Sequence, residues 1–253
     1  LNLGDRRANF YPTSPLDISP GTVVKTDWAY QSGETIVVDP ANLTFFNQSA
    51  RSLSGEQKIA VLLIDFADSP AAPFTAVEAA DIVFNGQVQN FYREQSYGAT
   101  NFTGQVFGWY RLPRNGVTEN GVCQWPAFGE GNELNQILST NVPDLAVYGG
   151  VVVMVNHPCM AGAFGSVGQY KMRLSDGREQ RLFQTFIGRL SGFDTGQGMP
   201  FPWRLIDTFL SHELGHNLGL MHANGWDCGA QTLGDNCQNR ESQNLFDVMG
   251  RGL

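Results

Sequence analysis

The chain has 253 residues, of which 42% are hydrophobic and only 16% are charged, and its formal net charge is −8. Nucleic acid and anionic membrane surfaces repel an acidic protein, so the charge argues against both as partners. The length allows one main domain with a substantial core, and no apolar run reaches the roughly 18 residues of a membrane span.

Residues 1–54 are expected to form an extended or small β appendage ahead of a main domain at residues 55–253. The segment is rich in proline and contains two short β-like runs, Thr22–Lys25 and Thr35–Val38. The stretch 49–55 is the most linker-like part of the chain. An extension wrapped over the core and the remnant of a propeptide are two further interpretations that the sequence leaves open.

The main domain begins with alternating strand and helix patterns, which predict an α/β (α+β) fold around a twisted mixed sheet. Lys58–Phe66 is a continuous apolar run and predicts a strand buried on both faces. Thr75–Gln95 has apolar residues at helical spacing, with Thr75 as the N-cap and Gly98 just past the end. Thr103–Leu112 is rich in aromatic and β-branched residues and predicts a second strand.

The pattern continues with a short helix at Glu130–Thr140, a third buried strand at Gly150–Asn156 and another strand at Leu182–Leu190. Ala161–Tyr170 is glycine-rich and suits an edge strand. The next helix is expected to start near Pro202–Arg204, because proline is tolerated in a first helical turn. The apolar stripe expected to bury this helix under the sheet is Leu205, Phe209, Leu210, Leu214 and Leu218.

This helix carries the most informative motif of the chain. Residues 212–222 read H-E-x-x-H-x-x-G-x-x-H and contain three of the four histidines. Residues four apart share a helix face, so His212 and His216 can direct ring nitrogens at one ion. In an unbroken helix His222 would lie roughly 15 Å along the axis from His212, too far to coordinate the same ion. The chain must therefore turn back, and Gly219 is expected to end the helix because glycine accepts positive φ.

The three histidines predict a catalytic zinc site, in which three protein ligands and a water surround the ion. Glu213 stands about 100° around the helix from His212, beside the ion without having to bind it. That position suits a general base that takes a proton from zinc-bound water, whose pKa the ion lowers to about 7. The predicted chemistry is attack of water on a polarised carbonyl, with Glu213 passing the proton to the leaving amine.

A second motif, Phe-Asp-Val-Met-Gly, follows at residues 246–250. A lone methionine usually packs in a core, but at this distance after the zinc motif Met249 resembles the Met-turn beneath the three-histidine zinc site of metzincin peptidases. Within the metzincins the chain resembles the gametolysin (autolysin) family over about residues 55–250. The similar stretches are 58–68, 159–164, 211–224 and 247–250.

The resemblance implies a metzincin-type zincin fold and a secreted zinc endopeptidase acting on extracellular or cell-wall proteins. It makes Met249 the structural floor of the site and places substrate binding on the edge strand in Ala161–Tyr170, through backbone hydrogen bonds. Metzincin domains continue into a C-terminal helix, so we expect that segment to be missing or separate. Astacin-like and serralysin-like members have a tyrosine where this chain has Arg251, so no oxyanion-stabilising residue is assigned.

Four cysteines, an even number, suit an oxidising compartment and favour a secreted or extracellular location. The favoured pairing is Cys228–Cys237, which flank a polar loop, with Cys123–Cys159 as the other bridge. Two other pairings and free thiols stay open, whereas a four-cysteine zinc site is disfavoured because no C-x-x-C pair exists. The chain starts at Leu1, which we interpret as a processed form without its targeting segment.

Calcium is a second candidate ion, because loop carboxylates of secreted peptidases often bind it, but the sequence assigns it no location. His157 is interpreted as a loop histidine in preference to a cleft residue. The carboxylates considered for calcium are Asp65, Asp68, Asp194, Asp227, Asp235 and Asp247.

Three alternatives to an active metzincin are retained. One is a gluzincin with Glu241 as the third ligand, against which Gly219 and His222 argue. Another is a zinc-binding or adhesion module without turnover, and the third is a latent zymogen whose cleft is blocked by residues 1–54. The expected partners are a protein or peptide substrate and a propeptide or inhibitor. A monomer is the simplest expectation for the oligomeric state.

Overall fold

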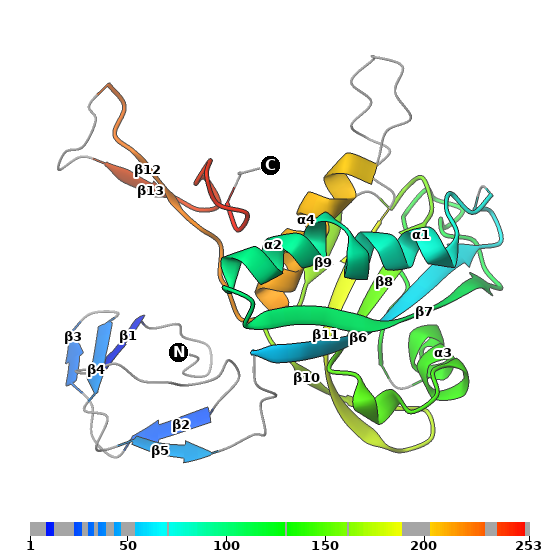
Figure 1. Cartoon of the computed structure of the whole chain (residues 1–253), viewed down its shortest axis with the longest axis horizontal. Helices are drawn as coiled ribbons and strands as arrows, with labels where there is room; N and C mark the ends of the chain where they lie inside the picture. Colours follow the sequence, from blue (N-terminus) through cyan, green and yellow to red (C-terminus); the bar gives the residue numbers. More distant parts are fainter. Residues whose placement is uncertain are drawn as a thin grey trace. The chain divides into compact units, whose positions relative to one another are not determined.

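A computed structural model describes residues 54–250 apart from residues 70, 130, 161, 189–202 and 231–236, with backbone alone at 203–205. In residues 1–53 it describes the backbone of five short strands. The chain divides into two compact units, Leu1–Ser52 and Leu53–Leu253 (Figure 1).

The first unit contains two small sheets. One has the strand order β1-β4-β3, and the other pairs β2 with β5 in antiparallel orientation. The predicted β-like runs are present as β2 and β4, whereas the other three strands were not predicted, because runs of three or four residues have too little pattern to stand out. The strands are β1 Asn9–Pro12, β2 Val23–Thr26, β3 Tyr30–Ser32, β4 Thr35–Val38 and β5 Leu43–Phe46. The linker-like stretch 49–55 lies mostly outside the described residues.

The second unit is built on a six-stranded, mostly parallel sheet with the order β10-β11-β8-β6-β7, and β9 also pairs with β11. Strand β6 is parallel to both neighbours, and β11 is parallel to β8. Only β9 and β10 run antiparallel, both against β11. The strands are β6 Gly55–Phe66, β7 Thr100–Leu112, β8 Gly150–Asn156, β9 Ala163–Gly165, β10 Tyr170–Arg173 and β11 Glu179–Ile187. The mixed α/β class predicted from the alternating pattern is therefore confirmed.

Helices cover both faces of this sheet, which explains the continuous apolar runs of its central strands. Alternate residues of β6 point to opposite sides. Ile59, Val61 and Leu63 pack with residues of α1, η2, α2 and α4, whereas Ala60, Leu62 and Ile64 pack with α3. Figure 1 shows the same arrangement, with α1, α2 and α4 on one side and α3 on the other. The helices are α1 Ala76–Ala80, η2 Asp81–Asn85, α2 Gln87–Gln95, α3 Glu133–Asn141, η3 Leu145–Val147 and α4 Trp203–Asn217.

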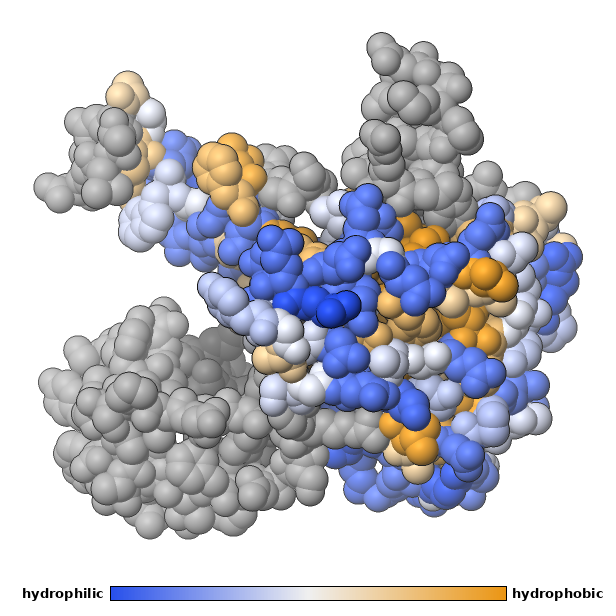
Figure 2. Space-filling view, in the orientation of Figure 1, coloured by the Kyte–Doolittle hydropathy of each residue, from blue (hydrophilic) through white to orange (hydrophobic). Residues whose placement is uncertain are grey.

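The predicted helix at Thr75–Gln95 consists of three pieces. Thr75 is the N-cap, as predicted, and it also forms a capping box with Glu78. The middle piece is a π-helix, and Gly86 separates it from α2 with a non-helical backbone. A Cβ at Gly86 would lie 2.8 Å from the Asp81 carbonyl oxygen, so the close turn there depends on glycine. The outer surface over α1 and α2 is largely hydrophilic (Figure 2).

Several predicted boundaries differ from the structure by a few residues. The helix expected at Glu130–Thr140 is α3, and the strand expected at Leu182–Leu190 is β11, which ends at Ile187. An edge strand was expected in Ala161–Tyr170. The structure has a strand there only at the three residues of β9, and Tyr170 belongs to the next strand, β10. In the stripe expected on α4, Leu210 and Leu214 are fully buried, Leu218 packs against the same cluster and Phe209 is only partly buried.

Both disulfides join the cysteines in the favoured pairing, Cys123 with Cys159 and Cys228 with Cys237. The second closes a hairpin formed by β12 Gly225–Asp227 and β13 Gln238–Arg240. Among the described residues, no helix is long and apolar enough to cross a membrane.

A buried asparagine at the end of α4 ties this helix to the sheet edge. The Asn217 amide donates to the carbonyl oxygens of Ser166 at 2.9 Å and Gln184 at 3.2 Å. Its oxygen accepts from the Thr185 hydroxyl, and both side chains are almost fully buried. Ser166 follows β9, and the other two partners, Gln184 and Thr185, lie in β11. The hydrogen bonds of Asn217 therefore join both strands to the end of α4.

We expect Asn217→Ala to lower the free energy of unfolding by about 3 kcal/mol, because it leaves several buried polar groups without partners. The measurement is a urea unfolding curve of metal-free protein. Asn85→Ala, which removes an exposed amide bonded to Asp81, serves as control and should change stability by less than about 0.5 kcal/mol. If Asn217→Ala lowers the free energy of unfolding by no more than Asn85→Ala does, Asn217 does not stabilise the joint between α4 and the two strands.

Candidate metal centre

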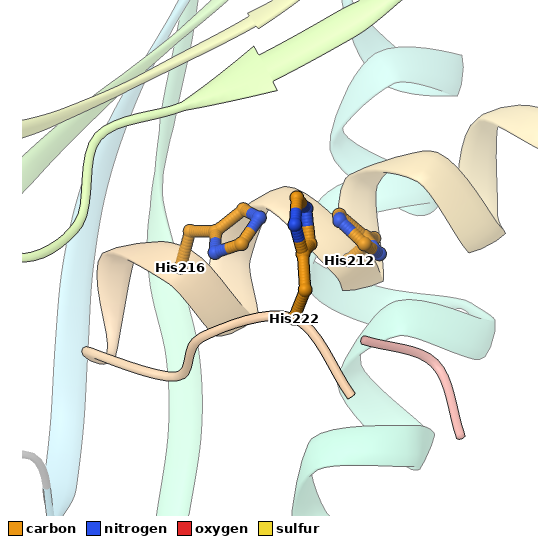
Figure 3. Close-up of side chains that lie close together, drawn as sticks. All are labelled: His212, His216 and His222. Carbon is orange, nitrogen blue, oxygen red and sulfur yellow. The ribbon is translucent and has the colours of Figure 1, made fainter. Parts of the chain in front are cut away.

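Helix α4 and the segment after it bring His212, His216 and His222 together. The first two lie one turn apart on α4, and the third approaches from the chain beyond the helix (Figure 3). Ring centroids are 4.8 Å apart for His212 and His216, 5.3 Å for His212 and His222, and 4.8 Å for His216 and His222. One nitrogen from each ring lies within 4.8 Å of the other two, so the group could hold one metal ion.

His222 lies close to the other two histidines because α4 ends in a Schellman turn that reverses the chain. The last helical residue is Asn217, and Gly219 has a φ of 92°, which favours glycine. The Leu220 amide donates to the Gly215 carbonyl at 2.9 Å, and the Gly219 amide donates to the His216 carbonyl at 2.8 Å. These two bonds satisfy carbonyls that the helix end would otherwise leave free and reverse the chain toward the site.

Each histidine is held through its Nδ1 atom. The partner of His212 is the Val248 carbonyl at 2.6 Å, and the partner of His216 is the Leu220 carbonyl at 2.8 Å. The partner of His222 is a side chain, the Glu241 carboxylate, at 3.2 Å. All three partners are oxygens that accept, so an imidazole that donates to them from Nδ1 leaves the lone pair of Nε2 free for a metal.

The donor set fits zinc. Three imidazoles whose second nitrogens are held by hydrogen bonds make up the protein part of a catalytic zinc site. Burial lowers the pKa of His212 below its ordinary value, although the hydrogen bond to the Val248 carbonyl opposes the shift, and a lowered pKa favours the neutral ring that a metal binds. The site residues present are thus compatible with zinc in charge, atom type and spacing.

Met249 packs against α4 at Gly215. Its side chain is buried, and a Cβ placed on Gly215 would overlap its sulfur atom. Gly215 therefore allows the methionine to approach the helix backbone between His212 and His216. The turn is fixed by the Asp247 carboxylate, which accepts the Met249 amide at 2.8 Å, and by the Met249 carbonyl, which accepts the Ala223 amide at 2.8 Å.

Glu213 is buried between α4 and β9. Its carboxylate accepts the Gly165 backbone amide, and a Cβ on Gly165 would come within 2.6 Å of the Glu213 carbonyl oxygen. Burial raises the pKa of Glu213 to about 7, although the Gly165 amide and His222 oppose the shift. A carboxylate whose pKa lies near neutrality can both accept and release a proton, as a general acid–base residue must.

Strand β9 and the loop after it lie against the C-terminal half of α4. It pairs with β11 in register Phe186↔Phe164, and the loop that follows it donates the Gly168 amide to the His216 carbonyl at 3.0 Å. The glycine-rich composition of the segment is explained at Gly165, where any side chain would displace Glu213.

The other titratable candidates lie elsewhere or have partners of their own. His157 is buried, with Nε2 3.3 Å from the Asp68 carboxylate and its ring edge against Phe66, which fits the loop-histidine interpretation. Asp65 pairs with Arg111, and Asp227 pairs with Arg240. Within the described part of the chain, only the three histidines form a group suited to a metal, so no calcium site is identified there. Asp194, Asp235 and Arg251 lie outside the described residues.

Three residues of the site have roles that the sequence did not predict: Gly165, Asn217 and, as a partner of His222, Glu241. Asn217 directly follows His216, the second histidine of the motif. A polar residue at the end of a helix that must be buried was a signal that the sequence offered. Gly165 is distant from the motif in sequence, and the sequence suggested Glu241 only as a direct metal ligand in the gluzincin alternative.

We expect Gly219→Ala to destabilise the metal-free protein by about 1–2 kcal/mol, because an alanine at positive φ is strained. Asn tolerates this conformation better, so Gly219→Asn should cost less. Zinc affinity, measured by chelator competition, should fall with the alanine variant because His222 is displaced.

Gly177→Ala is the matched control for the glycine substitution. Gly177 has a φ of 84°, and a Cβ added there would meet no atom within 4 Å, so alanine adds backbone strain alone. It should lower stability similarly and leave zinc affinity unchanged. Equal zinc affinity for Gly219→Ala and Gly177→Ala would contradict the role assigned to the turn.

No protein-family model matches the chain, and a search of curated proteins finds none with significant similarity. Its function is therefore inferred from its own motif and geometry.

Proposed function

We propose that this chain is a secreted zinc-dependent endopeptidase of metzincin type, resembling the gametolysin family, that hydrolyses peptide bonds of extracellular or cell-wall proteins. The observation that carries the proposal is the convergence of His212, His216 and His222, with the buried carboxylate of Glu213 on the same helix. The Met249 turn beneath Gly215 supports the metzincin assignment. Two disulfides support an oxidising, extracellular location.

The three histidines would hold the ion through their Nε2 atoms, because each Nδ1 is already engaged. Zinc, when bound, supplies a Lewis acid that polarises the substrate carbonyl and lowers the pKa of water. Glu213 takes a proton from the attacking water as the new C–O bond forms. It then gives that proton to the amide nitrogen as the C–N bond breaks, which returns the carboxylate to its starting state.

The surroundings of Glu213 suit this proton transfer. The Gly165 amide stabilises the ionised carboxylate and fixes its direction, whereas burial favours the protonated form. The two effects oppose each other, so neither state of Glu213 is strongly disfavoured. Strand β9, which supplies Gly165, is also the strand on which the resemblance places backbone hydrogen bonds to an extended substrate.

We expect Glu213→Gln to lower peptide hydrolysis by about 10²–10⁴-fold, because the base is lost while the ligands remain. Bound zinc, measured by elemental analysis, should stay at the wild-type level. His222→Ala should lose both zinc and hydrolysis. Glu119→Gln, which removes an exposed carboxylate after β7, is the control and should behave as wild type.

These variants separate the competing functions when hydrolysis is followed by mass spectrometry on a peptide library. Zinc binding without any hydrolysis in wild type, or hydrolysis unaffected by Glu213→Gln, would favour a binding module. Full zinc content in His222→Ala would favour the gluzincin alternative with Glu241 as ligand. Hydrolysis that appears only after removal of residues 1–54 would favour a latent zymogen.

Removal of the metal gives an independent check. Treatment with 1,10-phenanthroline should abolish hydrolysis, and added zinc should restore it, whereas calcium alone should not. Disulfides and the sheet do not depend on the ion, so the circular dichroism of the metal-free protein should remain close to that of the holoprotein. Hydrolysis that persists in fully metal-free protein would exclude the proposed mechanism.

A further inference from the structure

We infer that Glu241, carried by the disulfide-closed β12–β13 hairpin, is a positioning residue that orients His222 for the metal. The inference rests on the proposed zinc site. It assigns Glu241 to the Nδ1 side of the ring, so the carboxylate acts through the histidine and does not bind the ion.

The three ligands are supported unequally. His212 and His216 belong to α4, and backbone carbonyls hold their Nδ1 atoms at 2.6 and 2.8 Å. His222 lies beyond the helix end, its side chain is 37% exposed, and its partner is a side chain 19 residues further along the chain. Its ring direction therefore depends on a contact outside the zinc motif.

The hairpin brings Glu241 to this contact. Gly225 pairs with Arg240, so Glu241 is the first residue beyond the paired strands on the side nearest His222. Backbone bonds hold the two segments together: the Asn244 amide donates to the Ala223 carbonyl at 3.2 Å, and the Ser242 amide donates to the Asn224 side chain at 3.3 Å.

The far end of the same hairpin is closed covalently. Cys228 and Cys237 are joined directly beyond β12 and before β13. Asp227 and Arg240 form an ion pair across the strands at 3.3 Å. These links limit how far β13 can separate from β12, and they keep the residue after β13 close to His222.

The contact contributes little to the stability of the fold itself. The Glu241 side chain is 80% exposed, and a hydrogen bond at such a solvent-accessible site stabilises a fold only weakly. A carboxylate that accepts Nδ1–H nevertheless fixes the tautomer and raises the basicity of Nε2, and loss of such a partner lowers metal affinity about 10–100-fold. The expected effect is on zinc affinity, with stability nearly unchanged.

The test measures zinc dissociation constants of the full chain by chelator competition. Glu241→Ala should weaken zinc binding about 10–100-fold, and Glu241→Gln should weaken it less because the amide oxygen can still accept. Asn239→Ala is the matched control, since Asn239 lines the same surface hollow as His222 and Glu241. It should bind zinc as wild type does. The unfolding midpoint of the metal-free protein should be the same for all three variants.

A spectroscopic readout separates orientation from simple charge loss. In cobalt-substituted protein, Glu241→Ala should change the visible absorption bands that report ligand geometry, and Asn239→Ala should not. The Cys228→Ser/Cys237→Ser variant should also weaken zinc binding. In the Glu241→Ala background the same cysteine substitutions should add little, because both act through one contact.

The outcomes distinguish this inference from the function on which it rests. Wild-type protein that binds no zinc overturns both. Zinc binding by wild type with an unchanged dissociation constant for Glu241→Ala overturns the inference and leaves the proposed function standing. A loss of zinc as complete as that of His222→Ala would also overturn it, since Glu241 would then be a direct ligand.

Discussion

The reversal of the chain after α4 is the constraint on which the site depends. A helix can align two imidazoles one turn apart, but it carries any residue ten positions on roughly 15 Å away. Placing a nitrogen of His222 within 4.8 Å of those of His212 and His216 requires the helix to end and the chain to fold back within a few residues. The Schellman turn at Gly219 achieves this with two backbone bonds, which satisfy carbonyls at the helix end and so avoid the cost of burying them unpaired.

The reversal brings further elements against α4 from several sides, and glycine is found where they approach most closely. The sheet covers the helix through Leu210 and Leu214, and the turn at Met249 approaches its backbone at Gly215. Strand β9 approaches at Gly165, where its backbone meets Glu213. A glycine inside a helix costs about 1 kcal/mol relative to alanine. That cost is offset by the burial of Met249 against Gly215, so tertiary packing outweighs local helix propensity at this position.

The elements that could be predicted from sequence are those whose pattern is local. Strand β8 was predicted with its observed bounds because it is buried along its whole length and therefore reads as one apolar run. The grouping of the three histidines could be predicted because helix geometry puts His212 and His216 on one face and Gly219 offers a place for the chain to turn back toward them. Strand β9 is too short to show a period, and the π-helical piece before Gly86 keeps the apolar spacing of an ordinary helix. Glu241 is an exposed carboxylate 19 residues from His222, and only the folded hairpin relates the two.

The unequal support of the ligands has a thermodynamic consequence. His212 and His216 are ordered by the helix whether or not a metal is present, whereas the segment that bears His222 would lose conformational freedom on binding if it were loose beforehand. Two backbone bonds of Ala223, one to Met249 and one from Asn244, fix the chain directly after His222, and the disulfide-closed hairpin adds a third restraint. The fold therefore holds His222 in place without help from a metal. For the proposed zinc site, little of the free energy of binding would then be needed to arrange the chain.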